Sequence, residues 1–192
     1  MKILFATSNQ NKAAEVSSML PEHFEILTLK DINHTEEIPE TSPSIKGNAM
    51  QKANFILDNY SVDCFADDTG LEITALDGEP GVISARYAGE QRSDEDNMAL
   101  VLKKLEDQSD RSAQFRTVIA LNIRGIQFVF EGIVKGQILK VARGENGFGY
   151  DPIFEPENCG KSFAEMNMEE KNSFSHRARA FAKMIEYLNL NQ

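Results

Sequence analysis

The first third of the chain alternates short apolar runs with stretches of helical periodicity, and this alternation constrains the fold more than any other feature. Apolar runs at 3–6, 24–29 and 62–66 predict buried strands. Helices are expected between them, around 13–20 and over 44–57. Parallel strands need crossover helices of this kind, so the order is typical of an α/β fold.

The rest of the chain adds a β-rich segment and two further helices. Ser93, followed by three acidic residues, predicts the start of a helix that reaches 105. Two long strands are expected over 115–123 and 126–135, and Arg124-Gly125 between them fits a tight antiparallel hairpin. A last helix is expected over 171–190. Since no linker interrupts the sequence, residues 1–192 are interpreted as one mixed-sheet α/β domain.

Composition excludes several classes of protein. The 192 residues are 41% hydrophobic and 26% charged, which is ordinary for a soluble globular protein. Twenty Lys and Arg against 30 Asp and Glu give a net charge of −10, so no nucleic-acid or membrane partner is expected. No apolar run approaches the ~20 residues of a membrane helix, and no full signal core follows Met1. Cys64 and Cys159 have no metal-type spacing, so both are expected to be reduced thiols of a cytoplasmic protein.

A polar segment follows the first predicted strand. Its residues are Thr7, Ser8, Asn9, Gln10, Asn11 and Lys12. A strand–helix corner offers free backbone amides and the positive end of a helix dipole, and the lysine adds a charge, so the segment fits a phosphate site. It lacks the glycines of a Walker loop. The same residues also fit an ordinary polar turn capped by Ser8 or Asn9.

Two adjacent acids, Asp67 and Asp68, are expected where the strand at 62–66 ends. Buried carboxylates are costly unless a cation compensates them, and Mg²⁺ is commonly held by one or two carboxylates plus substrate phosphates. A carboxylate there can also accept a proton from an attacking water. Glu40 in the preceding acidic loop is a candidate second ligand. The alternative is a capping Asp and a turn before Gly70.

Two further segments carry polar and aromatic groups. Residues 147–152 combine flexible glycines with Phe148, which can stack on a nucleobase, and Asp151, which can accept hydrogen bonds from a base. Lys171, His176 and Arg177 precede or begin the last predicted helix and can hold phosphate or carbonyl oxygens. Residues 147–152 also fit an ordinary turn with aromatic side chains in the core. Lys171, His176 and Arg177 also fit the polar first turn of an amphipathic helix.

Taken together, these segments resemble the inosine triphosphate pyrophosphatase family, the non-canonical purine nucleoside triphosphate (dITP/XTP) pyrophosphatases. Each motif is weak alone, but their order along nearly the whole chain is specific. The matching segments are 7–12, 47–53, 66–71, 80–81, 84–87, 147–152, 170–171 and 175–177.

The resemblance implies an elongated two-lobed α/β fold with a central nucleotide cleft, in a homodimer. It implies Mg²⁺-dependent hydrolysis of ITP, dITP and XTP to the monophosphate and pyrophosphate, which cleanses the nucleotide pool. Asp68 would be the catalytic residue and a metal ligand, with Glu40 and Asp67 as further candidate ligands. The implied substrate-binding residues are Thr7, Ser8, Asn9, Gln10, Asn11, Lys12, Lys52, Thr69, Phe148, Gly149, Tyr150, Asp151, Lys171, His176 and Arg177.

The chain departs from the family pattern at two positions. Pro39 precedes Glu40 where many relatives have a second acid, and Gly47 stands where many have Glu. Two alternatives to the implied activity remain open. One is a pyrophosphatase for other modified nucleotides, and the other is a nucleotide-binding module without turnover.

Overall fold

The computed structural model describes residues 1–21 and 23–191. The chain divides into two compact units, each assembled from segments that are distant in the sequence. Unit 1 comprises Met1–Asp68, Thr117–Gly132 and Arg177–Gln192, and unit 2 comprises Thr69–Arg116 and Ile133–His176. Three strands are shared by the two units because the unit boundaries fall within them.

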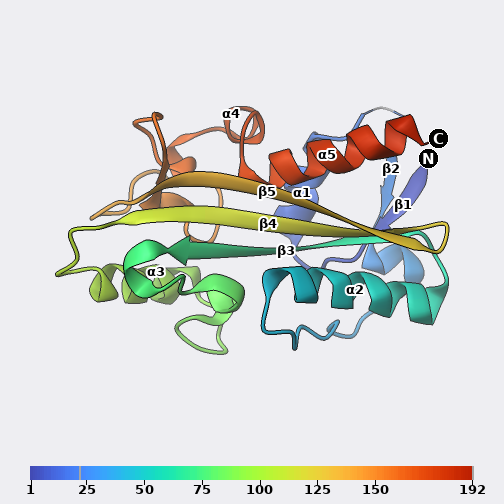
Figure 1. Ribbon diagram of the computed structural model, residues 1–192, viewed down its shortest axis with the longest axis horizontal. Coiled ribbons are helices and arrows are strands. Elements are labelled where there is room, and N and C mark those ends of the chain that lie inside the picture. Colours follow the sequence, from blue (N-terminus) through green and yellow to red (C-terminus); the bar gives the residue numbers. More distant parts are fainter. Residues whose placement is uncertain (22, 192) are drawn as a thin grey trace. The chain divides into compact units, whose positions relative to one another are not determined.

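The strands form one mixed sheet in the order β2-β1-β3-β4-β5-β6 (Figure 1). Their bounds are β1 Lys2–Phe5, β2 Glu25–Leu27, β3 Cys64–Ile73, β4 Ser112–Ile123, β5 Ile126–Ile138 and β6 Phe154–Pro156. β1 pairs in parallel with both β2 and β3, whereas β5 pairs antiparallel with β6. The expected α/β class, with a parallel early portion, is therefore confirmed.

Helices cover both faces of the sheet in unit 1 (Figure 1). They are α1 Gln10–Ser18, α2 Ile45–Tyr60 and α5 His176–Leu190. A short 3₁₀ helix, η1 Leu29–Ile32, lies between β2 and α2 in the chain. Phe5 and Phe65 share a core with Val16 of α1 and with Phe181 of α5. The thiol of Cys64, the neighbour of Phe65, donates instead to the carbonyl of Ala53 in α2 at 3.3 Å. Successive residues of β3 thus face different helices, as a pleated strand requires.

Unit 2 has its own core, in which aromatic side chains from several elements pack together. Phe115 contacts Phe154 and Phe163, with ring centroids 4.7 and 6.0 Å away, and Leu71 and Leu105 complete the cluster. The helical elements are η2 Thr74–Leu76, η3 Gly81–Arg86, α3 Asp94–Lys104, η4 Asp151–Ile153, η5 Phe163–Glu165 and α4 Met168–Asn172.

Local signals predicted several elements correctly. The Ser93 side chain accepts a hydrogen bond from Asp96 N at 3.1 Å and caps α3 as expected. Arg124 and Gly125 have φ of 52° and 78°, the left-handed pair of a two-residue hairpin between β4 and β5. Within the described residues, no helix has the length and apolar character needed to cross a bilayer.

Two differences from the expected elements bear on the candidate site. β3 does not end at Ala66 but continues through both aspartates, because each buried carboxylate has polar or charged partners on other elements. The closing helix is two helices, α4 and α5, separated at 173–175. Where the first helix ends, Ser173 Oγ donates to the carbonyl of Glu170 at 2.7 Å, and the half-buried Phe174 packs against Phe163.

Candidate functional site

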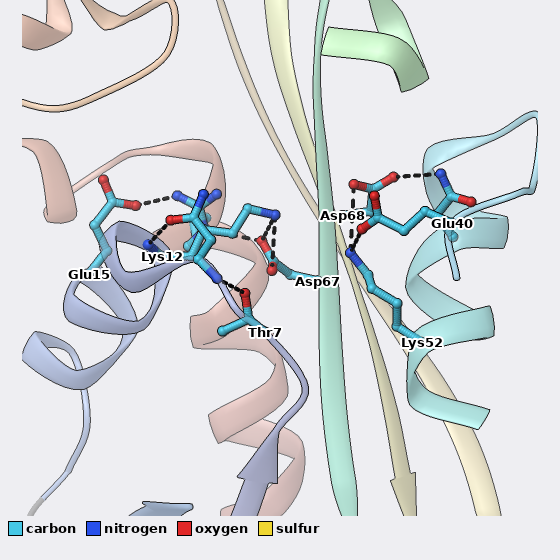
Figure 2. A network of polar contacts seen from close by, with 10 residues as sticks. Thr7, Lys12, Glu15, Glu40, Lys52, Asp67 and Asp68 are labelled. Carbon is cyan, nitrogen blue, oxygen red and sulfur yellow. Dashed lines mark hydrogen bonds and ion pairs between the residues drawn. The ribbon is translucent and has the colours of Figure 1, made fainter. Parts of the chain in front are cut away.

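β3 directs Asp67 and Asp68 to opposite faces of the sheet in unit 1, where different helices supply their partners (Figure 2). Asp67 lies on the side of α1 and α5, and Asp68 lies on the side of α2. The side chain of Asp67 is 1% exposed, whereas that of Asp68 is 11% exposed. The two acids that are adjacent in the sequence therefore have different direct partners, although the charges of Lys12 and Lys52 act on both.

Asp67 is held by two cations. Lys12 Nζ lies 3.2 Å from each of its carboxylate oxygens, and Arg177 Nε donates to Oδ2 at 3.2 Å. Arg177 is itself buried and also donates to the carboxylate of Glu15. These groups form a buried network of two acids and two bases that fixes α1 and the start of α5 to β3 (Figure 2).

Asp68 faces a second, more open group of residues. Lys52 of α2 is paired with Glu40, and its Nζ lies 3.9 Å from Asp68 Oδ1. Asn48 donates to Asp68 Oδ2 at 3.3 Å while its own amide oxygen accepts from Ser42 N at 2.9 Å. Glu40 is 33% exposed, so this side of β3 keeps carboxylate oxygens within reach of a ligand.

The pKa values of the two aspartates move in opposite directions. Burial acts to raise the pKa of Asp67, but Lys12, Arg177 and Lys52 outweigh it and hold that pKa well below its ordinary value. Burial also raises the pKa of Asp68, and there Lys52 and Lys12 do not fully offset it, so the pKa lies above its ordinary value. Paired carboxylates with diverging pKa values are a common sign of divided catalytic roles. Asp68 is the stronger base of the two.

The loop that carries Glu40 is fastened to α2. Gln51 accepts from Thr41 N and donates to Thr41 Oγ1, both at 2.9 Å. Gly47 permits this close approach, because a Cβ there would lie 1.8 Å from Ser42 Oγ. The departure from the family pattern at position 47 is therefore matched by the tight packing of this loop.

Glu40 and Asp68 are suited to a hard cation. Both present carboxylate oxygens around Lys52, and burial leaves Asp68 incompletely compensated. Among the described residues, no group of three or more His, Cys, Asp or Glu could hold a metal alone. Such a set fits Mg²⁺ bound jointly by carboxylates and phosphates, and it does not fit a metal held by protein ligands only.

The polar corner after β1 forms the capped start of α1. Asn9 Oδ1 accepts from Lys12 N at 3.1 Å, and Thr7 Oγ1 accepts from Asn9 N at 3.2 Å (Figure 2). Ser8, Gln10 and Asn11 are exposed. The first-turn amides and the Lys12 ammonium make this corner electropositive.

The aromatic loop, residues 147–151, belongs to unit 2. Asp151 is buried, and its Oδ2 accepts from Phe148 N at 2.9 Å and from Lys171 Nζ at 2.6 Å. Lys171 Nζ also lies 5.0 Å from the centroid of the Phe148 ring. Tyr150 is buried and donates its hydroxyl to the carbonyl of Ser84 at 2.7 Å. Asp151 and Tyr150 thus shape the loop from inside, while Phe148 and Gly149 remain partly exposed.

The structure separates some residues that the sequence analysis grouped. Lys171 pairs with Asp151, His176 stacks on Phe115 at 4.5 Å, and Arg177 pairs with Asp67 and Glu15. Thr69 continues β3 and is half-buried. The direct contacts to a base that were expected of Asp151, His176 and Arg177 stay predictions.

Sequence reasoning missed Glu15 and Asn48. Both carried a usable signal, because Glu15 is three residues after Lys12 on α1 and Asn48 is four before Lys52 on α2. These spacings place each on the helix face of a predicted site lysine.

The chain is an α/β protein with a mixed sheet, and its capped corner between β1 and α1 is the kind of place where such folds commonly bind phosphorylated ligands. More narrowly, the chain belongs to the Ham1 family, whose sequence model matches residues 3–187. It is 56% identical over 188 residues to the dITP/XTP pyrophosphatase of Flavobacterium johnsoniae, covering 98% of each chain. It is 47% identical over 188 residues to the protein of the same name from Porphyromonas gingivalis, covering 97% of each.

Solved structures agree with the family assignment. The Staphylococcus aureus Ham1 protein superposes with a TM-score of 0.91 at 36% identity, covering 100% of both chains. A HAM1 protein from Coxiella burnetii gives a TM-score of 0.90 at 36% identity over 98% of both chains.

Proposed function

We propose that this protein hydrolyses non-canonical purine nucleoside triphosphates, namely dITP, ITP and XTP, to the monophosphate and pyrophosphate. The observation that carries the proposal is the split environment of Asp67 and Asp68, found in a chain whose relatives are named dITP/XTP pyrophosphatases. Such an enzyme removes deaminated purines from the nucleotide pool.

In unit 1 the triphosphate binds the start of α1. The first-turn amides, Thr7 and Ser8 donate to phosphate oxygens, and Lys12 and Lys52 supply charge. Burial lowers the pKa of Lys12, although the charge of Asp67 acts in the opposite direction. A phosphate that binds beside the ammonium adds negative charge and therefore stabilises the charged form of Lys12. A chain of net charge −10 needs such local cations to attract a triphosphate.

Glu40 and Asp68 would hold Mg²⁺ together with the phosphates. When bound there, the ion neutralises phosphate charge and makes the phosphorus more open to attack. Asp67 is not assigned as a ligand, because Lys12 and Arg177 engage its buried carboxylate. Its contribution is to fix Lys12.

Asp68 accepts the proton of the attacking water. The water oxygen forms a bond to the α-phosphorus, the α–β bridging bond breaks, and pyrophosphate leaves. The raised pKa of Asp68 improves its basicity, and Asn48 orients the carboxylate by donating to Oδ2.

In unit 2 the loop of Phe148 and Gly149 recognises the base. Phe148 stacks on the purine, and nearby donors pair with the 6-oxo group of hypoxanthine or xanthine. Adenine presents an amino group at that position, which places donor against donor.

We further propose that the protein is a homodimer and that it is cytoplasmic. Light scattering of the purified protein checks the homodimer.

A nucleotide panel tests the function. With Mg²⁺ present, dITP and XTP should be hydrolysed far faster than dATP or dGTP, with pyrophosphate as the co-product. Preferential turnover of modified pyrimidine nucleotides would favour the alternative house-cleaning activity. Tight dITP binding without turnover would favour a binding module.

A further inference from the structure

The aromatic loop is held from outside by a residue of α3. Asp94 Oδ2 accepts a hydrogen bond from Gly149 N at 2.7 Å, across 55 positions of the sequence. Asp94 is the first residue of α3, and both groups belong to unit 2. Base recognition by Phe148 and Gly149, as proposed above, does not by itself require the hydrogen bond from Gly149 to Asp94.

The two ends of the loop are fixed in different ways. Its buried end is anchored through Asp151 to Lys171 and through Tyr150 to Ser84. Its exposed end contains Gly147 and Gly149, whose φ values of +76° and +63° lie in the left-handed region. Glycine reaches this region at little cost and leaves it as easily. Between the two glycines, Phe148 N donates to Asp151 Oδ2 at 2.9 Å, so the buried end restrains one side of Phe148 and leaves the Gly149 side to other contacts.

Asp94 acts on this exposed end. The amide it accepts from follows directly after Phe148, the residue proposed to stack on the base. The hydrogen bond therefore restrains the backbone on the C-terminal side of Phe148, while Asp151 restrains its N–H. A charged acceptor makes such a bond stronger than a neutral one would.

We propose that Asp94 is a positioning residue for base recognition, which holds Gly149 and thereby presents Phe148 to the purine. The inference rests on the proposed function and adds to it a residue of α3. Asp94 touches neither the reacting phosphate nor the acid pair in this account. It acts on substrate binding more than on the chemical step.

A general effect on α3 is the competing explanation. The first turn of α3 contains three acids, Asp94, Glu95 and Asp96, and each favours the helix by its charge near the N-terminus. If charge alone mattered, Glu95 would count as much as Asp94. If the contact with the loop matters, Asp94 should count more than Glu95, because Asp94 accepts the hydrogen bond from Gly149. Asn in place of Asp94 should then be tolerated, because it keeps an acceptor oxygen although it loses the charge.

The experiment compares Asp94→Ala, Asp94→Asn and Glu95→Ala with the wild type, using KM and kcat for dITP and calorimetric binding of dIMP without metal. Asp94→Ala should raise KM and weaken dIMP binding by about fivefold, with kcat within about twofold. Both alanine variants should lower the melting temperature slightly, because each removes a charge that favours the helix. Asp94→Asn should restore most of the affinity, and Glu95→Ala should bind dIMP as the wild type does.

The inference is overturned if Asp94→Ala leaves affinity unchanged or improves it, or if Glu95→Ala weakens it equally. Improved affinity would mean that Asp94 competes with the base for the Gly149 amide. Failure of the proposed function is distinct, since a wild type that binds dIMP without hydrolysing dITP still reports the effect of Asp94 on binding.

Discussion

The ammonium nitrogen of Lys12 lies 3.2 Å from both carboxylate oxygens of Asp67. A cation at the polar start of α1 is therefore paired with a buried acid. Arg177 approaches the same carboxylate and continues the network to Glu15. Lys12 is thereby held beside the start of α1 before any ligand arrives. An acidic chain can in this way keep a positive charge at a proposed phosphate site.

Replacing Lys12 should affect both binding and stability. Lys12→Ala is expected to raise KM for dITP about tenfold and to lower stability by up to about 3 kcal/mol, because Asp67 keeps only part of its compensation. Thermal unfolding and steady-state kinetics measure the two effects. Lys12→Ala combined with Asp67→Asn should recover stability but not affinity. Recovery of affinity in the double variant would contradict a direct role of Lys12 in phosphate binding.

Asp68→Asn tests the proposed base. The variant keeps the shape but loses basicity and charge, so kcat for dITP should fall by about two orders of magnitude or more. The melting temperature should not fall, because the change removes a partly buried charge whose pKa is raised. Asp58→Asn makes the same charge change on an exposed part of α2 and should behave as the wild type. Near-normal turnover by Asp68→Asn would exclude the assigned role.

Phe148→Ala should weaken the binding of all purine nucleotides alike. Loss of stacking is expected to lower kcat/KM by roughly tenfold for dITP and dATP, with little change in their ratio. Phe148→Tyr retains the ring and serves as the control. A marked change in the dITP/dATP ratio would show that Phe148 discriminates between bases.

The two cysteines should differ in reactivity with pH. Cys64 is buried, and burial together with the charge of Asp63 raises the pKa of its thiol from 9.0 to about 12. Because the folded-state pKa is the higher one, the native thiol stays protonated between pH 9 and pH 12, where the unfolded thiol ionises and the contribution to stability declines. Alkylation at pH 9 should give one adduct per native chain, at Cys159, and two in denaturant. Cys159→Ser should give none while folded.

Much of the candidate site could be proposed from local signals in the sequence. Lys12, Asp68 and the loop at 147–151 stand out through motifs that need no knowledge of tertiary contacts. The different environments of Asp67 and Asp68 were not predicted, because β3 was expected to end at Ala66. A strand read through to Ile73 would have placed the two acids on opposite faces.

Long-range partners could not be predicted from local pattern. Glu15 and Arg177 are 162 positions apart, and only the packing of α1 and α5 on the same face of the sheet brings them together. Arg177 was likewise grouped with Lys171 because one continuous helix was expected. At the break over 173–175, the half-buried Phe174 packs against Phe163, which is a tertiary contact.

The bond that is broken tests the central claim most directly. The wild-type protein would be incubated with dITP and Mg²⁺ in ¹⁸O-labelled water. The products would then be separated and their masses measured by mass spectrometry. Attack on the α-phosphorus predicts one ¹⁸O atom in dIMP and unlabelled pyrophosphate. Label in pyrophosphate, or release of orthophosphate as the main co-product, would contradict the account.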